Sequence, residues 1–133
     1  MGNTALRRVN FADVQTAQDG AALIISVLHE NDQSVLIYGT VSCREEIEAV
    51  EAAIKKKTPI LIYGRHANDE AIYKKYHHIA SLGGYPLIYT GGLFEWLLLQ
   101  EIHDTQQFRT HGYTLDFLKY SPPATINARL LTY

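Results

Sequence analysis

The chain contains 133 residues, which is enough for one domain with a single buried core. Its 47% hydrophobic and 20% charged residues are ordinary for a folded globular protein, and this balance excludes a largely disordered chain. The formal net charge of −2 gives no electrostatic reason to expect nucleic acid or an anionic membrane as a partner.

The chain begins with a polar segment, residues 1–10, that lacks the apolar core of a signal peptide. No apolar run is long enough to span a bilayer. The single cysteine, Cys43, cannot form an intramolecular disulfide. We therefore expect an intracellular, cytoplasmic protein in which residues 1–10 form an N-terminal arm.

Four short apolar runs, each bounded by turn-forming residues, predict β-strands. They cover residues 22–27, 34–39, 60–64 and 86–89. The runs are apolar throughout rather than alternating, which is typical of strands in a sheet that is covered on both faces.

The segment 42–57 predicts a helix between the second and third strands. Ser42 and Glu45 have the spacing of a capping box, which places the helix start at Ser42. Four residues at helical spacing predict an apolar face directed at the core. They are Cys43, Ile47, Val50 and Ile54.

Three further helices are predicted downstream. One carries the apolar stripe Ile72, Tyr76 and Ile79 and ends at Gly83-Gly84. Another follows Gly91-Gly92 and runs through the apolar cluster around Trp96, which we expect either in the core or against a partner chain. A short helix at residues 115–120 ends before two prolines.

This alternation of strands and helices predicts parallel strands joined by right-handed crossovers. The expected fold is a three-layer α/β domain with a central, mainly parallel sheet. We place the domain at residues 11–120 and a C-terminal tail at residues 121–133. Ligands of such sheets bind beyond the carboxyl ends of the strands. The loops 39–42, 64–69 and 90–93 are therefore the candidate site.

The third strand and its loop read ILIYGRHANDEA and are followed by a helix, a Gly84-Tyr85 turn and the strand PLIY. The motif GGLFEW comes next, with Gly91, Gly92 and Trp96. Over residues 11–101 this order resembles a rhodanese-like domain, which has a strand ending in Tyr-Cys, a loop C-R-x-G-x-R, a Gly-Tyr turn and G-G-x-x-x-W. The first half is more degenerate, with Ser26 in place of the acid of the usual L-I-D-V-R strand.

The resemblance implies a rhodanese-like fold and identifies the loop after the third strand as the former active site. Active members use the loop cysteine as a thiolate that accepts sulfur as a persulfide. Here Gly64 stands at the cysteine position, Arg65 at the second loop position, Ala67 at the usual glycine and Asp69 at the closing arginine. Because glycine carries no nucleophile, the resemblance implies a catalytically inactive variant.

The degenerate loop, formed by Gly64, Arg65, His66, Ala67, Asn68 and Asp69, remains a candidate binding site. Arg65 and His66 offer positive charge, and N–H groups at the start of the next helix would face an anion. Acidic residues at that position are also an ordinary way to cap a helix, with Asn68 or Asp69 as the cap. An anion site and a purely structural loop both stay open, and the structural loop is the favoured one.

Cys43 is the alternative nucleophile. It follows the predicted helix cap, where a thiolate is stabilised, although its place on the apolar face beside Ile47 favours a buried and inert thiol. The neighbouring His77 and His78 point about 100° apart on a helix, so we expect no metal site there. The spacing of four later residues also fits no familiar metal pattern. These are His103, Asp104, His111 and Asp116.

We therefore expect an inactive rhodanese-like module, without cofactor or metal, that binds a protein partner or a small anion. The alternative is a sulfurtransferase- or redox-type enzyme that uses Cys43 in place of the missing loop cysteine. The oligomeric state is open.

Overall fold

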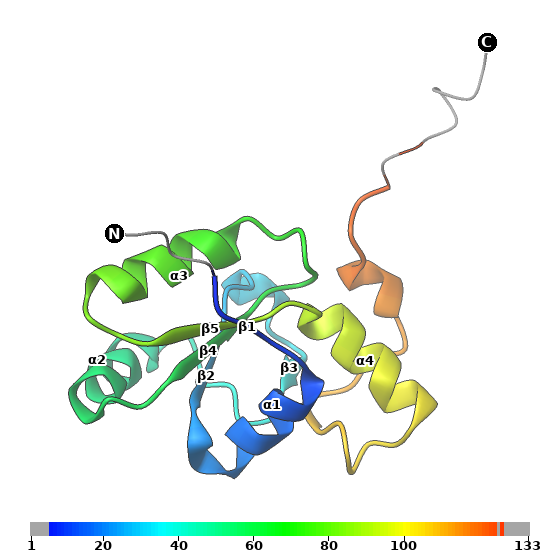
Figure 1. The fold of residues 1–133 in the computed structure, drawn as a ribbon. Coiled ribbons are helices and arrows are strands. Elements are labelled where there is room, and N and C mark those ends of the chain that lie inside the picture. The colour runs from blue at the N-terminus through cyan, green and yellow to red at the C-terminus, as the bar shows by residue number, and fades with distance from the viewer. Residues whose placement is uncertain (1–5, 125, 127–133) are drawn as a thin grey trace.

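Residues 6–124 and 126 are described by the structure, a computed structural model, and they form a mixed α/β fold (Figure 1). The strands are β1 (Arg8–Val9), β2 (Leu23–Ser26), β3 (Leu36–Ile37), β4 (Ile60–Tyr63), β5 (Pro86–Tyr89) and β6 (Thr110–His111). The α-helices are α1 (Phe11–Thr16), α2 (Glu46–Lys56), α3 (Ala71–Ser81) and α4 (Gly92–Ile102). Shorter helical turns are η1 (Ala17–Ala21), η2 (Glu30–Asp32) and η3 (Phe117–Tyr120).

In the described part of the chain, a central four-stranded sheet has the order β1-β5-β4-β2, and all of its strand pairs are parallel. Ile25 of β2 lies opposite Ile62 of β4, which in turn lies opposite Ile88 of β5. An isolated parallel bridge between Ile24 and Thr40 extends the sheet beyond β2. All four residues of β4 are buried, as expected for a strand covered on both faces.

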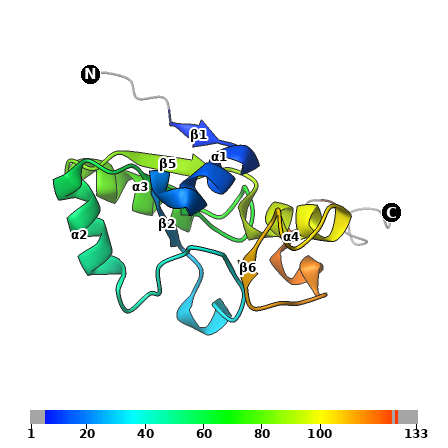
Figure 2. The same ribbon diagram turned by 90° about the horizontal axis from the view of Figure 1, so that it is seen from below.

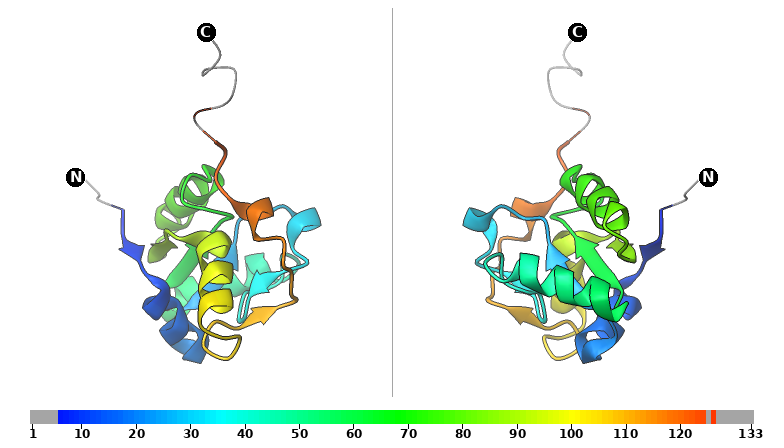
Figure 3. Two further views of the ribbon diagram at one scale, coloured as in Figure 1. Left: turned by 90° about the vertical axis from the view of Figure 1, so that its right-hand side faces the viewer. Right: turned by 90° about the vertical axis from the view of Figure 1, so that its left-hand side faces the viewer.

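The two faces of the sheet are covered by different helices, which confirms the predicted three-layer α/β fold. On one face, Ile62 and Ile88 pack in a cluster with Val50 of α2 and Ile72 of α3. On the other face the sheet packs against α1 and α4, and Trp96 lies in this second cluster. The right-hand view of Figure 3 shows α2 and α3 side by side in front of the sheet.

The prediction that residues 34–39 form a strand of the central sheet is wrong. Only Leu36–Ile37 are extended, as β3, and they pair antiparallel with β6 in a separate two-stranded sheet. Figure 2 shows β6 beside α4 and away from β1, β5 and β2. The fourth strand of the central sheet is instead β1, at the edge beside β5 and within the expected N-terminal arm, where Arg8 lies opposite Ile88. An apolar run indicates burial but does not specify which strand it will pair with.

The predicted start of the second helix is also wrong. α2 begins at Glu46, and residues 43–45 form a turn. The Ser42 hydroxyl donates to the carboxylate of Glu45 at 3.4 Å. A capping box would instead require reciprocal bonds between these side chains and the backbone, and α2 has no side-chain cap.

The buried face of α2 differs from the predicted stripe because the helix begins later. Val50 and Ala53 are buried, whereas Ile47 is 73% exposed. Cys43 lies in the turn before the helix and is partly exposed. The expected packing of Cys43 against Ile47 on one buried face is therefore not observed.

A complete capping box occurs instead at Asn10, before α1. The Asn10 side chain accepts the N–H groups of Ala12 and Asp13 at 2.9 and 3.3 Å. The Asp13 carboxylate accepts the Asn10 N–H at 3.0 Å. These reciprocal bonds fix the start of α1 directly after β1.

The predictions for α3 and α4 are confirmed. Ile72, Tyr76 and Ile79 form the buried face of α3. The helix ends at Ser81, Gly83 follows with a φ of +90°, and the Gly84 N–H donates to the carbonyl of Ile79 at 3.0 Å. Trp96 and Leu97 of α4 are fully buried, so this apolar helix belongs to the core.

The predicted helix at residues 115–120 is the shorter 3-10 turn η3, in which Tyr120 is buried. The predicted tail at 121–133 lies mostly outside the described residues, which exclude 125 and 127–133. Among the residues that the structure describes, no helix is long and apolar enough to cross a lipid bilayer.

Candidate functional site

The candidate loop, residues 64–69, joins the carboxyl end of β4 to the start of α3. Tyr63, the last residue of β4, directly precedes the loop and is fully buried. Its hydroxyl accepts the N–H of Ile37 at 3.0 Å and lies 2.7 Å from Oγ1 of Thr40. Burial raises the pKa of Tyr63 above its ordinary value, so the hydroxyl stays protonated and links β4 to the segment after β2.

The carboxylate of Asp69 occupies the inside of this loop. Its Oδ2 accepts the Arg65 N–H at 3.3 Å, and its Oδ1 accepts the Ala71 N–H at 3.2 Å. The N-cap of α3 is Glu70 and makes no side-chain cap bond, so the prediction of Asn68 or Asp69 as the cap is wrong. Asp69 accepts the Ala71 N–H from the position before the cap, and the backbone N–H of Asn68 donates to Nδ1 of His66 at 3.1 Å. Two of the N–H groups that could face an anion are already bound to an internal carboxylate.

There is little space for a side chain at Gly64. A methyl group built on its Cα would lie 2.7 Å from Oδ2 of Asp69 and 3.0 Å from Cδ1 of Ile72. Contacts this short force neighbouring atoms to move. The loop geometry therefore accommodates a glycine at this position and a carboxylate beside it.

The start of α4 holds the loop from the other side. The N–H groups of Leu93 and Phe94 donate to the carbonyls of Gly64 and Arg65, both at 2.9 Å. Gly92 has a φ of +68°, and a methyl group there would lie 2.9 Å from the carbonyl oxygen of Gly64. This close approach explains the glycine at residue 92, and the loop carbonyls face the N-terminus of α4.

The Arg65 side chain points toward η3. Its guanidinium donates to the carbonyl of Lys119, and its Cζ lies 5.8 Å from the centre of the Tyr120 ring. The buried Nε of Arg65 has no hydrogen-bond partner among the described residues. The arginine expected to attract an anion is thus used to attach the C-terminal segment to the loop.

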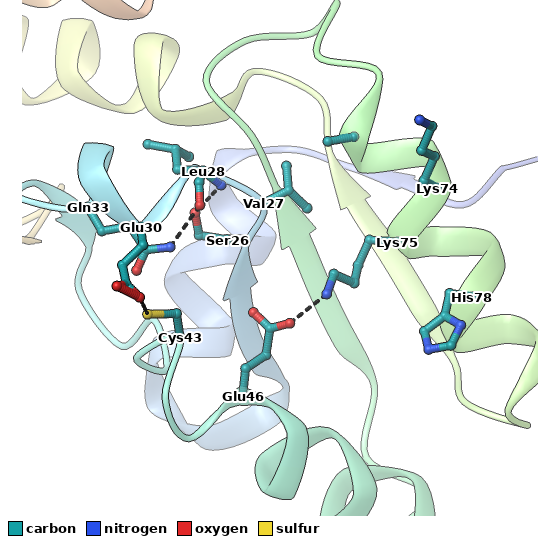
Figure 4. A pocket seen from close by; sticks show the side chains of 11 residues that line it. Ser26, Val27, Leu28, Glu30, Gln33, Cys43, Glu46, Lys74, Lys75 and His78 are labelled. Atoms are coloured by element: carbon teal, nitrogen blue, oxygen red, sulfur yellow. Dashed lines mark hydrogen bonds and ion pairs between the residues drawn. The ribbon is translucent and has the colours of Figure 1, made fainter.

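Cys43 lies in a different place, on an open pocket of about 400 Å³ beyond the end of β2 (Figure 4). Its sulfur donates to the carboxylate of Glu30 at 3.6 Å. On the opposite wall, Lys75 forms an ion pair with Glu46 at 2.6 Å. None of residues 64–69 lines this pocket, so the two predicted site features are not brought together.

Sequence reasoning missed Glu30, Gln33, Lys74 and Lys75, which line the same pocket as Cys43. For Glu30 and Gln33 the available signal was their position, because residues 27–33 follow the carboxyl end of β2.

Three of the four residues considered for a metal have other side-chain contacts. His111 accepts the Gly39 N–H at 3.2 Å, His103 stacks on Phe108, and Asp104 accepts the N–H groups of the following turn. Within the described residues, no three side chains of histidine, cysteine, aspartate or glutamate lie together as metal ligands would.

Tyr89 and Glu95 form a polar pair at the start of α4. The Tyr89 hydroxyl donates to Oε1 of Glu95 at 2.6 Å. Burial, followed by the hydrogen bond to this carboxylate and its negative charge, raises the pKa of Tyr89 far above its ordinary value. A methyl group on Gly91 would lie 2.4 Å from the Glu95 side chain, so the pair depends on a glycine at that position.

The sequence matches no protein-family model and no curated protein. Among solved structures, the Alr3790 protein from Anabaena sp. has a TM-score of 0.56 and 19% identity, covering 82% of this chain and 83% of that one. A full-length protein from Lactobacillus plantarum has a TM-score of 0.53 and 16% identity, covering 70% of this chain and 82% of that one. A Rhodanese_3-like domain of the same Alr3790 protein aligns at 21% identity with a TM-score of 0.48, over 68% of this chain and 98% of the domain. The central parallel sheet, its flanking helices and the match to Alr3790 show that this chain has a rhodanese-like fold.

Proposed function

We propose that this protein is a catalytically inactive rhodanese-like module that acts by binding a protein partner in the cytoplasm. The carboxylate of Asp69 inside the loop beside Gly64 is the observation that carries this proposal. Residue 64 has no nucleophile, and the N–H groups of Arg65 and Ala71 already have an acceptor. These features favour a protein partner over a small anion, because an incoming anion would meet a carboxylate.

Exposed apolar side chains near the loop support a protein partner. Tyr113, Leu115 and Leu118 are 60%, 69% and 75% exposed. They lie on the segment that Arg65 attaches to the loop through the carbonyl of Lys119. Large apolar side chains gathered on one exposed segment are typical of interaction surfaces.

The absence of sulfur transfer is tested with thiosulfate and cyanide. An active rhodanese moves the outer sulfur of thiosulfate to cyanide, which yields thiocyanate and sulfite. We expect the wild-type chain to form no thiocyanate above the protein-free rate. Calorimetry with sulfate and thiosulfate should show no binding to the wild type and weak binding to Asp69→Ala, which frees two N–H groups. Thiocyanate formation by the wild type would contradict the proposal, and its loss in Cys43→Ser would assign the activity to Cys43.

A second candidate function uses Cys43. Lys74, Lys75 and His78 line the same pocket, and the ammonium group of Lys74 supplies positive charge for an anionic sulfur donor. Glu30 accepts the thiol proton at 3.6 Å. In this scheme the deprotonated sulfur attacks the outer sulfur of thiosulfate, and sulfite leaves with the electron pair of the broken S–S bond. The product is a persulfide on Cys43.

Mass spectrometry separates the two candidates. If Cys43 is the nucleophile, thiosulfate adds the mass of one sulfur atom to the wild type and none to Cys43→Ser, and Glu30→Gln slows the addition. If the protein is a binding module, the wild-type mass stays unchanged. The neighbour of the sulfur is a carboxylate rather than the histidine or lysine that usually activates a thiol, and this favours the binding module.

A further inference from the structure

The segment after β6, residues 113–121, packs against α4 and is joined to the loop at residues 64–69. We call it the C-terminal strap, and Figure 1 shows its helical turn η3 in orange beside α4. Phe117 is partly buried, and Tyr120 is 1% exposed in the apolar cluster on this side of the sheet. Three other large side chains of the strap are exposed, namely Tyr113, Leu115 and Leu118.

A single hydrogen bond joins the C-terminal strap to the rest of the described chain. The Arg65 guanidinium donates it to the carbonyl of Lys119. The other hydrogen bonds of the strap within the described residues close on the strap itself, such as that from the Ser121 N–H to the carbonyl of Leu118 at 3.1 Å. The strap is therefore held by one polar contact and by the burial of its aromatic rings, chiefly that of Tyr120.

Arg65 is poorly satisfied in this arrangement. Its Nε is buried and has no hydrogen-bond partner among the described residues. The one ion pair within residues 6–124 and 126 joins Lys75 to Glu46, so no carboxylate there pairs with the guanidinium. A second positive charge lies close by, because Nζ of Lys119 and Cζ of Arg65 are 5.6 and 5.8 Å from the centre of the Tyr120 ring. A partly buried cation without an anionic partner is costly, and release of the strap would remove that cost.

We propose that the C-terminal strap is an autoinhibitory contact that opens and closes over Arg65. In the closed form, described here, the carbonyl of Lys119 occupies the guanidinium and Tyr120 fills the core beside α4. In the open form residues 113–121 leave the domain surface while the central sheet and its helices stay folded. Segments with few buried contacts open in this way at a lower free energy than the whole domain. The open form presents Arg65 to an anionic group, and such a ligand shifts the population toward it.

The C-terminal strap and Asp69 block different parts of an anion site. Asp69 occupies the backbone N–H groups of Arg65 and Ala71, whereas the strap occupies the guanidinium. The carboxylate of Asp69 lies inside the loop, but the strap can be displaced as a unit. Of the two, the strap is therefore the one that a ligand can regulate. This inference goes beyond the proposed function, because it concerns access to Arg65 and holds whether or not a protein partner binds.

Chemical modification of arginine tests the C-terminal strap directly. Phenylglyoxal reacts with guanidinium groups that solvent reaches, and peptide mass spectrometry measures the rate at each arginine. In the wild type, Arg65 should react at least ~10-fold more slowly than the exposed Arg44. Tyr120→Ala removes the buried anchor of the strap, so Arg65 should react nearly as fast as Arg44. The matched control is Tyr113→Ala, the same substitution at an exposed position of the strap, in which Arg65 should stay slow.

Two further measurements apply if Tyr120→Ala does not fold, as judged by circular dichroism. Tyr120→Leu keeps an apolar side chain in the core but removes the ring, so Arg65 should react at an intermediate rate. In the wild type, urea below the unfolding transition should raise the rate at Arg65 toward that at Arg44 while the circular dichroism spectrum stays unchanged.

Calorimetry with sulfate tests whether the open form binds an anion. Asp69→Ala combined with Tyr120→Ala should bind sulfate at least ~5-fold more tightly than Asp69→Ala alone, because the guanidinium is then free as well. Adding Arg65→Gln should remove this gain. Asp69→Ala combined with Tyr113→Ala is the control and should bind sulfate as Asp69→Ala does.

Three results would overturn the proposal. If Arg65 reacts as fast as Arg44 in the wild type, the C-terminal strap does not cover it. If Arg65 stays slow in a folded Tyr120 variant, or in urea until the whole domain unfolds, residues 113–121 are a fixed part of the core. If the gain in sulfate affinity is absent, or survives Arg65→Gln, the strap does not withhold Arg65 from an anion. None of these results bears on the thiocyanate assay, which tests the proposed function separately.

Discussion

The carboxylate of Asp69 accepts the backbone N–H of Arg65 at 3.3 Å and so closes the loop after β4 from within. In a loop that binds an external anion, such N–H groups point at the ligand. Here the chain supplies its own negative charge, and the same aspartate also accepts the Ala71 N–H at the start of α3. One side chain thus stabilises the helix start and takes the position that a bound anion would need.

Gly64→Cys should not create a working sulfurtransferase. The new side chain would overlap Asp69 and Ile72, so we expect a loss of about 1–3 kcal/mol in the free energy of unfolding. Urea denaturation measures this loss, and Gly64→Cys combined with Asp69→Gly should recover part of it. The thiocyanate assay should stay at background, because Ala67 and Asp69 still occupy the positions of the family glycine and arginine. Robust turnover by the single variant would show that these two differences matter little.

Gly92→Ala should lower the free energy of unfolding about twice as much as Gly83→Ala, although both glycines have a positive φ. The Gly83 position, at φ +90°, has no atom within 4 Å of an added methyl group, so only the backbone conformation is strained, by about 1–2 kcal/mol. At Gly92 the methyl group would also meet backbone atoms of Gly64 and His66 at 2.9 Å. We expect about twice the loss in unfolding free energy there. Equal losses in the two variants would show that the α4–loop contact is looser than the structure indicates.

Asn10→Ala should destabilise the protein, whereas Ser42→Ala should have almost no effect. Asn10 accepts two N–H groups at the start of α1, and loss of such a cap costs about 1 kcal/mol. Ser42 contacts only the Glu45 side chain, so the change should stay within about 0.5 kcal/mol. Thermal or urea denaturation of the pair measures both values. A larger loss for Ser42→Ala than for Asn10→Ala would favour a capped α2 that begins at Ser42.

The buried tyrosines should make the protein less stable at alkaline pH. The unfolded chain loses tyrosine protons near the ordinary pKa of 10.0, whereas burial raises the pKa values of Tyr63 and Tyr89 in the fold. Below pH 10 both states keep these protons, and above it only the folded state does. The free energy of unfolding should therefore fall above pH 10, by up to about 1.4 kcal/mol per pH unit for each tyrosine.

Tyr63→Phe should remove its share of this slope. It should also cost about 1–3 kcal/mol at pH 7, because the buried Ile37 N–H loses its acceptor. Tyr113→Phe serves as the control, since this side chain is 60% exposed and its removal should change neither value. A pH slope unchanged by Tyr63→Phe would mean that the hydroxyl ionises as readily in the fold as in the unfolded chain.

The sequence by itself determined the fold class. Continuous apolar runs predicted β2, β4 and β5, and the stripe of Ile72, Tyr76 and Ile79 predicted the buried face of α3. Such patterns are local, because a helix or strand must direct its own apolar side chains inward whatever partner it meets. The glycine pair before α4 and the loop after β4 could also be located from the sequence, because glycines and polar residues separate the apolar runs.

Only the tertiary structure decided how these elements pair and what the loop contains. Leu36–Ile37 lie outside the central sheet and β1 is one of its strands, contrary to the prediction. Strand pairing depends on contacts between residues far apart in the chain. The turn before α2 left Ile47 exposed and placed Cys43 beside Glu30 rather than in the core. Sequence could show that residue 64 lacks a nucleophile. That the carboxylate of Asp69 fills the loop, while Arg65 binds η3, depends on distances that only the folded chain defines.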